Sequence, residues 1–307
     1  MSLGAGLAGR VPSKALAEPV VAQPDAPAPA RKHLQAMTTD PSHTLPVKLS
    51  WQATHEFWQI QVLYEDEHLI ALNKPAGLLT SPDRYDPTRP NLMRLLHESI
   101  ACGKPWAKQR GLNYLMNAHR LDFDTSGVIL LAKSKPVLVK LVELFGSEKP
   151  VKQYIALVHG RPRNDHFEID AKLALHPTMP GMMKVDNAHG KKARTVFDVL
   201  EVFSGYALLN CMPVTGRTHQ IRVHLQYAGL PIVGDATYGG APLLLSRLKP
   251  DYKLKRGQTE RPLINRPALH AERLQLTHPV TSEQLTIVAP WPKDITVAVK
   301  YLRKFAK

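Results

Sequence analysis

Short apolar runs separated by turn-forming residues follow one another along the chain from Trp51 onward. Five of them have the length and composition of β-strands: 60–64, 69–73, 128–132, 154–158 and 206–212. The first two flank an acidic turn and predict a hairpin. Leucines and valines at helical spacing predict helices over 92–100 and 137–145, the second one between Ser134 and Gly146. Because strands and helices mix without regular alternation, the pattern indicates an α+β fold.

The first 50 residues have a different composition from the rest. They contain seven prolines and nine alanines, and the first aromatic residue of the chain is Trp51. Such a segment buries too little apolar surface to offset the entropy lost on ordering. We therefore expect a flexible tail over 1–50 and one folded domain over 51–307.

Composition and charge restrict the classes of protein that fit. The 307 residues are 44% hydrophobic and 21% charged, which is typical of a globular protein. Two distant cysteines argue against a disulfide scaffold or a zinc finger, and we predict no metal site. No apolar stretch is long enough to span a membrane, and we expect a cytoplasmic protein. Lys and Arg number 40 against 26 Asp and Glu, and this net charge of +14 favours a nucleic-acid partner.

A polar cluster precedes the predicted strand at 128–132. It contains His119, Arg120 and Asp122, followed by Thr125 and Ser126. A carboxylate on a turn that leads into a buried strand is held rigidly and can face a cleft, so Asp122 is a candidate nucleophile. The alternative is that the Asp122 side chain only caps the turn through Thr125 or Ser126.

A second cluster, over 216–224, places two arginines and two histidines within nine residues. If the segment is helical, Arg217, Gln220 and His224 approach one face. If it is extended, Gln220, Arg222 and His224 share a face instead. In both cases the guanidinium groups can meet a carboxylate or a phosphate.

Taken in order along the chain, several such segments resemble the RluA-type pseudouridine synthases. They are 73–78 (NKPAGL), 119–122 (HRLD), 125–127 (TSG), 152–154 (KQY), 216–224 (GRTHQIRVH), 229–235 (GLPIVGD), 238–239 (YG), 269–271 (LHA) and 278–279 (HP). The resemblance implies the pseudouridine synthase fold, in which helices flank a long, mixed, mainly antiparallel sheet with a central catalytic cleft. It implies no metal or organic cofactor.

The resemblance also implies roles for four residues. Asp122 matches the catalytic aspartate, Tyr154 the tyrosine that stacks on the target uracil, and Arg222 the arginine that pairs with the aspartate. Arg120 matches the residue that fills the helical gap when the uridine flips out. Without the resemblance, Tyr154 would be interpreted as strand packing and Arg120 as one half of a surface ion pair.

Contacts to RNA are expected from residues near these motifs and from a basic stretch at 246–266, which carries seven basic residues and two acids. Many RluA-type enzymes begin with a small S4 RNA-binding domain, and the tail at 1–50 is too short to be one. We predict RNA contacts from Arg120, His119, Lys152, Arg217, His219, Gln220, Lys253, Lys255 and Arg256.

The resemblance and the charge together predict an RNA pseudouridine synthase that isomerises uridine in structured RNA. Ribosomal RNA is favoured over transfer RNA, and we expect a monomer without an obligate protein partner. One alternative is a catalytically inactive RNA-binding protein of the same fold. Another is a hydrolase of glycosidic bonds, which needs a positioned water and commonly a second carboxylate, and only Asp124 lies near Asp122 in the sequence.

Overall fold

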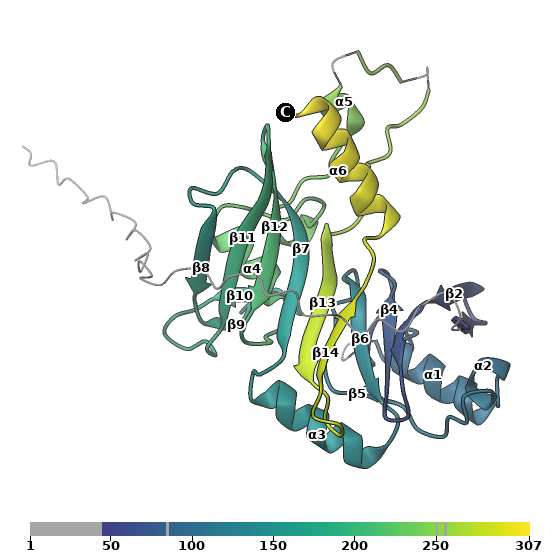
Figure 1. The fold of residues 1–307 in the computed structure, drawn as a ribbon. Coiled ribbons are helices and arrows are strands. Elements are labelled where there is room, and N and C mark those ends of the chain that lie inside the picture. The colour runs from purple at the N-terminus through teal and green to yellow at the C-terminus, as the bar shows by residue number, and fades with distance from the viewer. Residues whose placement is uncertain (1–44, 84–85, 250, 255–256) are drawn as a thin grey trace, which may run out of the picture. The chain divides into compact units, whose positions relative to one another are not determined.

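The computed structural model describes residues 45–83, 86–249, 251–254 and 257–307 (Figure 1). The strands are β1 (Val47–Trp51), β2 (Glu56–Ile60), β3 (Val62–Glu65), β4 (Leu69–Lys74), β5 (Met116–Asn117), β6 (Ser126–Ala132), β7 (Val151–His159), β8 (His166–Asp170), β9 (Leu173–Leu175), β10 (Met183–Val185), β11 (Arg194–Phe203), β12 (Tyr206–Pro213), β13 (Leu269–Thr277) and β14 (Gln284–Val288). The helices are α1 (Leu92–Ala101), α2 (Pro105–Lys108), α3 (Lys135–Gly146), α4 (Gln220–Tyr227), the 3-10 helix η2 (Ala236–Tyr238), α5 (Leu245–Leu248) and α6 (Lys293–Phe305). None of these helices has the length and apolar character needed to cross a membrane.

Ten of the strands in the described part of the chain form one sheet, in the order β3-β4-β6-β13-β7-β12-β11-β8, with β14 beside β13 and β5 beside β6. β13 runs parallel to β6, and the other pairs between these strands are antiparallel. The α+β class and the long, mixed, mainly antiparallel sheet expected from the sequence are thereby confirmed. The β3–β4 hairpin is confirmed as well, although Ile60 ends β2 instead of starting β3.

The register of the central strands brings together segments that lie far apart in the sequence. Gly127 on β6 aligns with Ala271 on β13, and Ala271 in turn aligns with Tyr154 on β7. A Cβ atom on Gly127 would lie 2.2 Å from the Ala271 carbonyl oxygen, so this close approach of β6 and β13 requires glycine. The loop before β6 is thus held two strands away from Tyr154, in the middle of the sheet.

Helices pack against the sheet and against the hairpin formed by β1 and β2 (Figure 1). α3 packs on β5 and β6, α4 packs on β11 and β12, and α1 packs against β1. The buried apolar residues form separate clusters around β1–β4 with α1, under α3, and between the β7–β12 region and α6.

The folded part begins before the boundary predicted at residue 51. Val47, Leu49 and Trp51 alternate with polar residues on β1, which pairs with β2. Val47 and Leu49 are 0% and 1% exposed. Period-two alternation over five residues is a short signal, and only the contact with α1 and β2 reveals it as a buried strand. The rest of the predicted tail, residues 1–44, lies outside the described residues.

Candidate active site

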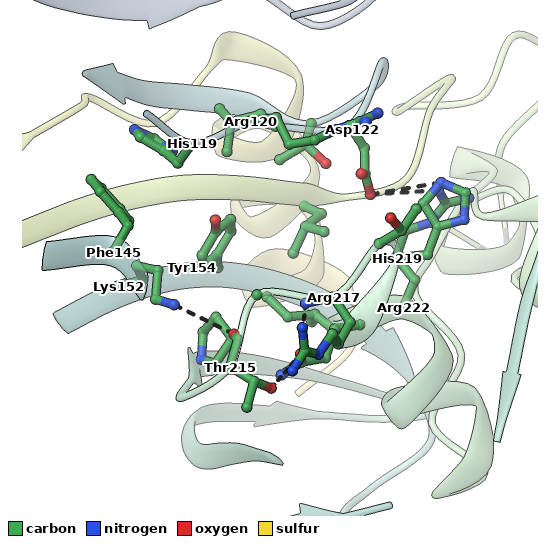
Figure 2. A pocket seen from close by; sticks show the side chains of 18 of the residues that line it. His119, Arg120, Asp122, Phe145, Lys152, Tyr154, Thr215, Arg217, His219 and Arg222 are labelled. Atoms are coloured by element: carbon green, nitrogen blue, oxygen red, sulfur yellow. Dashed lines mark hydrogen bonds and ion pairs between the residues drawn. The ribbon is translucent and has the colours of Figure 1, made fainter. Parts of the chain in front are cut away.

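Asp122 lies in the loop between β5 and β6. The Thr125 N–H donates to the Asp122 carbonyl oxygen (3.2 Å), so main-chain atoms close the turn. The carboxylate points into a pocket, where its Oδ2 atom lies 3.7 Å from Nη1 of Arg222 and 4.0 Å from Nε2 of His219 (Figure 2). The Asp122 side chain therefore faces cationic and polar groups at the start of α4. It does not cap the turn, contrary to the alternative interpretation of the sequence.

Hydrogen bonds from segment 77–80 hold the Asp122 loop in place. The Thr80 hydroxyl donates to the Leu121 carbonyl oxygen (2.9 Å) and accepts from the Leu121 N–H (3.2 Å). The Gly77 N–H donates to the carbonyl oxygen of Phe123 (3.0 Å). The motif at 73–78 and the motif at 119–122 are therefore two parts of one structural unit, and the residues on both sides of Asp122 are hydrogen-bonded to segment 77–80.

Lys74, at the end of β4, is the buried centre of this unit. Its Nζ donates to three carbonyl oxygens, those of Pro75 (2.9 Å), Leu78 (2.6 Å) and Phe123 (3.2 Å). Burial lowers the pKa of Lys74 to about 7, while the carboxylates of Asp122 and Asp124 act in the opposite direction. No role was predicted for Lys74 from the sequence, although a lysine directly after the predicted strand at 69–73 was a visible signal.

Arg222 is held by a partner that the sequence analysis did not assign to the site. Its guanidinium makes two hydrogen bonds to the carboxylate of Asp235, from Nε (2.6 Å) and from Nη2 (2.8 Å). The guanidinium also lies over the ring of Tyr238, 4.8 Å from the centroid. Asp235 and Tyr238 are each 1% exposed. Burial disfavours the charge of Arg222, but the hydrogen bonds and charge of Asp235 outweigh it and raise the pKa. Arg222 can thus direct its remaining Nη1 atom at Asp122 because its other atoms are already fixed.

α4 begins at Gln220, so the segment 216–224 is helical only in its second half. His219 precedes the helix in a left-handed conformation (φ 54°, ψ 18°), and its Nδ1 atom lies 2.8 Å from the Tyr238 hydroxyl. His224 is buried, with Nδ1 bonded to the Thr195 hydroxyl (2.9 Å) and Nε2 to the Ala171 carbonyl oxygen (3.0 Å). His219 therefore belongs to the pocket and His224 to the interior.

The pocket beside Asp122 has a volume of about 420 Å³ and is lined from the β5–β6 loop, α3, β7 and the start of α4 (Figure 2). Tyr154 from β7 and Phe145 from α3 contribute rings to its wall. Burial and the nearby Asp122 carboxylate raise the pKa of Tyr154, so the phenol stays protonated. A flat aromatic surface next to a fixed carboxylate suits a planar base attached to a sugar.

Three of the residues predicted to contact RNA surround the pocket. Arg120 is exposed at its rim. The Lys152 Nζ atom lies 3.4 Å from the carbonyl oxygens of Val214 and Thr215. The exposed Arg217 donates from Nε to the Lys192 carbonyl oxygen (2.9 Å).

Two other predicted RNA contacts are turned inward. The His119 ring accepts the Leu130 N–H on Nε2 (3.0 Å) and stacks on Phe145, and burial lowers its pKa to about 4. Gln220 is 4% exposed. Its amide oxygen accepts from the Thr215 hydroxyl and the Arg217 N–H, and its amide nitrogen donates to the Arg194 carbonyl oxygen and to Thr195 Oγ1. The Gln220 amide is therefore buried and its hydrogen bonds shape the loop before α4, and an RNA contact from this residue stays a prediction.

The basic stretch at 246–266 divides into two parts. Lys253 is exposed and lies outside the lining of the pocket, while Lys255 and Arg256 lie outside the described residues. Arg266 points inward: it pairs with Asp294 (2.7 Å), and its Nη1 donates to the Asp124 carbonyl oxygen (3.0 Å). Its charge therefore supports the Asp122 loop and is not free for phosphate.

A fixed carboxylate and guanidinium beside an aromatic wall, at the centre of this sheet, indicate an enzyme that acts on a nucleotide. The family model described as RNA pseudouridylate synthase matches residues 68–227. The chain is 36% identical over 250 residues to ribosomal large subunit pseudouridine synthase D of Xylella fastidiosa, covering 80% of this chain and 70% of that protein. It is also 36% identical over 244 residues to ribosomal large subunit pseudouridine synthase C of Escherichia coli K12, covering 79% and 70%. The chain belongs to the RNA pseudouridylate synthase family, which confirms the resemblance found in the sequence.

Solved structures are similar as well. Human RNA pseudouridylate synthase domain containing 4 superposes with a TM-score of 0.59 at 25% identity, over 79% of this chain and 92% of that one. Human RNA pseudouridylate synthase domain containing 1 superposes with a TM-score of 0.55 at 23% identity, over 76% and 84%. The predicted fold is confirmed, and the protein is an RNA pseudouridine synthase, an isomerase.

Proposed function

We propose that this enzyme isomerises uridine to pseudouridine in ribosomal RNA. The two bacterial relatives described above are named ribosomal large subunit pseudouridine synthases, and their names are the main support for ribosomal RNA as the substrate. The exposed cations Arg120 and Arg217 at the rim of the pocket support a polyanionic substrate. The alternative of an inactive RNA-binding protein is disfavoured, because Asp122, Tyr154 and Arg222 are all present around one pocket.

We assign the reacting carboxylate to Asp122. Isomerisation breaks the N1–C1′ bond, turns the uracil, joins C5 to C1′, removes the proton of C5 and leaves a proton on N1. A carboxylate can attack C1′ directly or remove a sugar proton to form a glycal, and both routes need the charged form. Arg222 places a positive charge 3.7 Å from the Asp122 carboxylate. The carboxylate of Asp235 is occupied by Arg222, and isomerisation needs no external water, so the site suits an isomerase better than a hydrolase.

Tyr154 and Arg120 are proposed to hold the flipped nucleotide. Uracil has to leave the base stack to reach Asp122, at a cost of a few kcal/mol. Stacking on the Tyr154 ring in the wall of the pocket offsets part of this cost. The exposed guanidinium of Arg120, two residues before Asp122, is close enough to the entrance to occupy the vacated space in the RNA.

Residues 45–307 are proposed as the catalytic domain. Asp122, Tyr154 and Arg222 all lie within this domain. That the protein is a monomer stays a prediction. Action in the cytoplasm, and on ribosomal in preference to transfer RNA, stay predictions.

The test is a map of pseudouridines across total RNA from cells with and without the gene. We expect one or more large-subunit ribosomal positions to lose the modification and to regain it with the wild-type gene but not with Asp122→Asn. The amide keeps the shape of the carboxylate and lacks its charge, so folding and RNA affinity should be unchanged. Loss of pseudouridine only from transfer RNA would refute the choice of substrate, and full complementation by Asp122→Asn would refute the role of Asp122.

A further inference from the structure

The Tyr238 hydroxyl sits between a main-chain donor and the ring of His219. It accepts the Met183 N–H from β10 (3.0 Å) and lies 2.8 Å from Nδ1 of His219. A phenol has a single proton, and here it has the His219 nitrogen as its partner. Nδ1 is then an acceptor, so the neutral ring carries its proton on Nε2. This is the atom that faces Oδ2 of Asp122 at 4.0 Å.

The backbone of His219 has an unfavourable conformation, which points to a functional role for its ring. Residue 219 has φ 54°, a left-handed conformation that side chains with a Cβ rarely adopt. Strain of this kind persists where the surrounding structure imposes it, and it concentrates at functional sites. The His219 ring packs edge-on against Tyr238, with centroids 5.6 Å apart and an interplanar angle of 80°. Its side chain is 20% exposed, so Nε2 remains open to the pocket.

Burial keeps the His219 ring neutral. Burial lowers the pKa of His219, and Arg222 and Arg120 act in the same direction, while Asp122 and Asp235 oppose them. A neutral ring has two tautomers, and only the one with the proton on Nε2 can donate to Asp122. Tyr238 selects that tautomer through its hydroxyl, and its ring face also supports the guanidinium of Arg222.

We propose that His219 is a positioning residue for Asp122 and that the Tyr238 hydroxyl keeps the His219 proton on Nε2, directed at Oδ2. Arg222 and His219 then approach the same carboxylate oxygen, at 3.7 and 4.0 Å in the free enzyme. Such contacts shorten when substrate fills a site. With both donors directed at Oδ2, we expect Oδ1 to face the sugar. This inference rests on the proposed role of Asp122 and gives His219 a partner within the protein in place of the RNA contact predicted from the sequence.

The first test separates the ring of His219 from its backbone. Glycine adopts φ 54° without strain, so His219→Gly should fold at least as well as the wild type while lacking the donor. His219→Asn, which also tolerates this conformation, is the second variant. Thermal melting of both variants measures what the lost contacts with Tyr238 cost in stability. We expect the single-turnover rate on an unmodified large-subunit ribosomal RNA transcript to fall about 10- to 100-fold, as for loss of one hydrogen bond to a charged group. The Kd for the transcript should change by less than about twofold, because the ring acts on Asp122 and not on the RNA.

The second test asks whether Tyr238 acts through His219. Tyr238→Phe removes the hydroxyl and keeps the ring under Arg222, and we expect a smaller fall in rate, about 3- to 10-fold. In the His219→Gly background the same change should have no effect on the rate. Tyr64→Phe is the matched control, because it removes a hydroxyl that donates to Asp66 (2.5 Å) from β3, outside the pocket. It should leave the rate unchanged.

Nitrogen-15 NMR of the histidine rings reads the tautomer directly in the free protein. The His219 ring should show a protonated Nε2 and a bare Nδ1 at neutral pH, and Tyr238→Phe should show a mixture of tautomers. A wild-type ring with its proton on Nδ1 would overturn the proposal. So would a Tyr238→Phe effect of equal size in both backgrounds, or a His219→Gly variant whose defect lies in Kd while its single-turnover rate is normal.

These outcomes differ from a failure of the proposed function. If the wild-type enzyme leaves the ribosomal transcript unmodified, the choice of substrate is wrong. The tautomer measured in the free protein then decides the inference about His219 by itself.

Discussion

The buried Lys74 makes the stability of this enzyme depend on pH in a direction set by its lowered pKa. Burial lowers the pKa from 10.5 to about 7 in the folded protein. Between these values the unfolded chain binds a proton that the folded chain has released, so the free energy of unfolding rises with pH. One pKa unit corresponds to about 1.4 kcal/mol, and this group therefore adds roughly 2 kcal/mol of stability between pH 7 and pH 9.

Lys74→Met removes the titration and leaves the carbonyl oxygens around Nζ without their donor. We expect the stability of the wild type relative to Lys74→Met to increase by roughly 2 kcal/mol from pH 7 to pH 9. Urea unfolding followed by circular dichroism at pH 7, 8 and 9 measures this difference. Lys48→Met, at an exposed position of β1, is the matched control and should keep a constant difference from the wild type. Parallel pH profiles for Lys74→Met and the wild type would refute the reasoning, because they would mean that Lys74 stays charged in the folded protein.

Three further outcomes are expected. Asp235→Asn should lower both the rate and the free energy of unfolding, the latter by about 3 kcal/mol, because it leaves the Arg222 charge buried without its carboxylate; thermal melting and single-turnover assays test this, and a normal melting temperature would contradict it. Arg120→Ala should slow modification more when the uridine is in a paired RNA than when it is in a flexible single strand, and an equal loss on both RNAs would exclude a role in filling the helical gap. Neutralising Lys253 with its basic neighbours at 255 and 256 should reduce the slope of log affinity against log salt by about 0.7 to 0.9 for each phosphate contact that is lost. An unchanged slope would mean that these residues do not contact RNA.

The elements that the sequence predicted correctly are those with a strong local signal. β6 is a mainly apolar run that is buried on both faces. α3 lies between Ser134 and Gly146 as its leucine and valine spacing indicates, although the Ser134 side chain makes no capping hydrogen bond. Such patterns depend on neighbours within a few residues, so they can be recognised without knowledge of the fold. The short strand at Val47–Trp51 carries a weaker pattern, and only its partner β2 makes it recognisable.

The secondary structure of segment 216–224 could not be predicted from the local sequence. Its residues are compatible with a helix and with a strand, and the structure resolves the choice by starting α4 at Gln220. The loop before the helix is shaped by the buried Gln220 amide, whose partners lie on β11 as well as nearby in the chain. A glutamine beside arginines in a sequence is indistinguishable from a surface residue until those partners are known.

By itself, the sequence determined the membership of the chain in its family and the candidate residues Asp122, Tyr154 and Arg222, because the ordered motifs carry that information directly. Tertiary structure alone decided what surrounds Asp122. Lys74 reaches the Phe123 carbonyl oxygen from 49 residues away, and Asp235 binds Arg222 from 13 residues away. Burial and ion pairing depend on distances that sheet register and helix packing set between remote segments. The charge of each group, and the direction in which its pKa moves, therefore become readable only when the chain has folded.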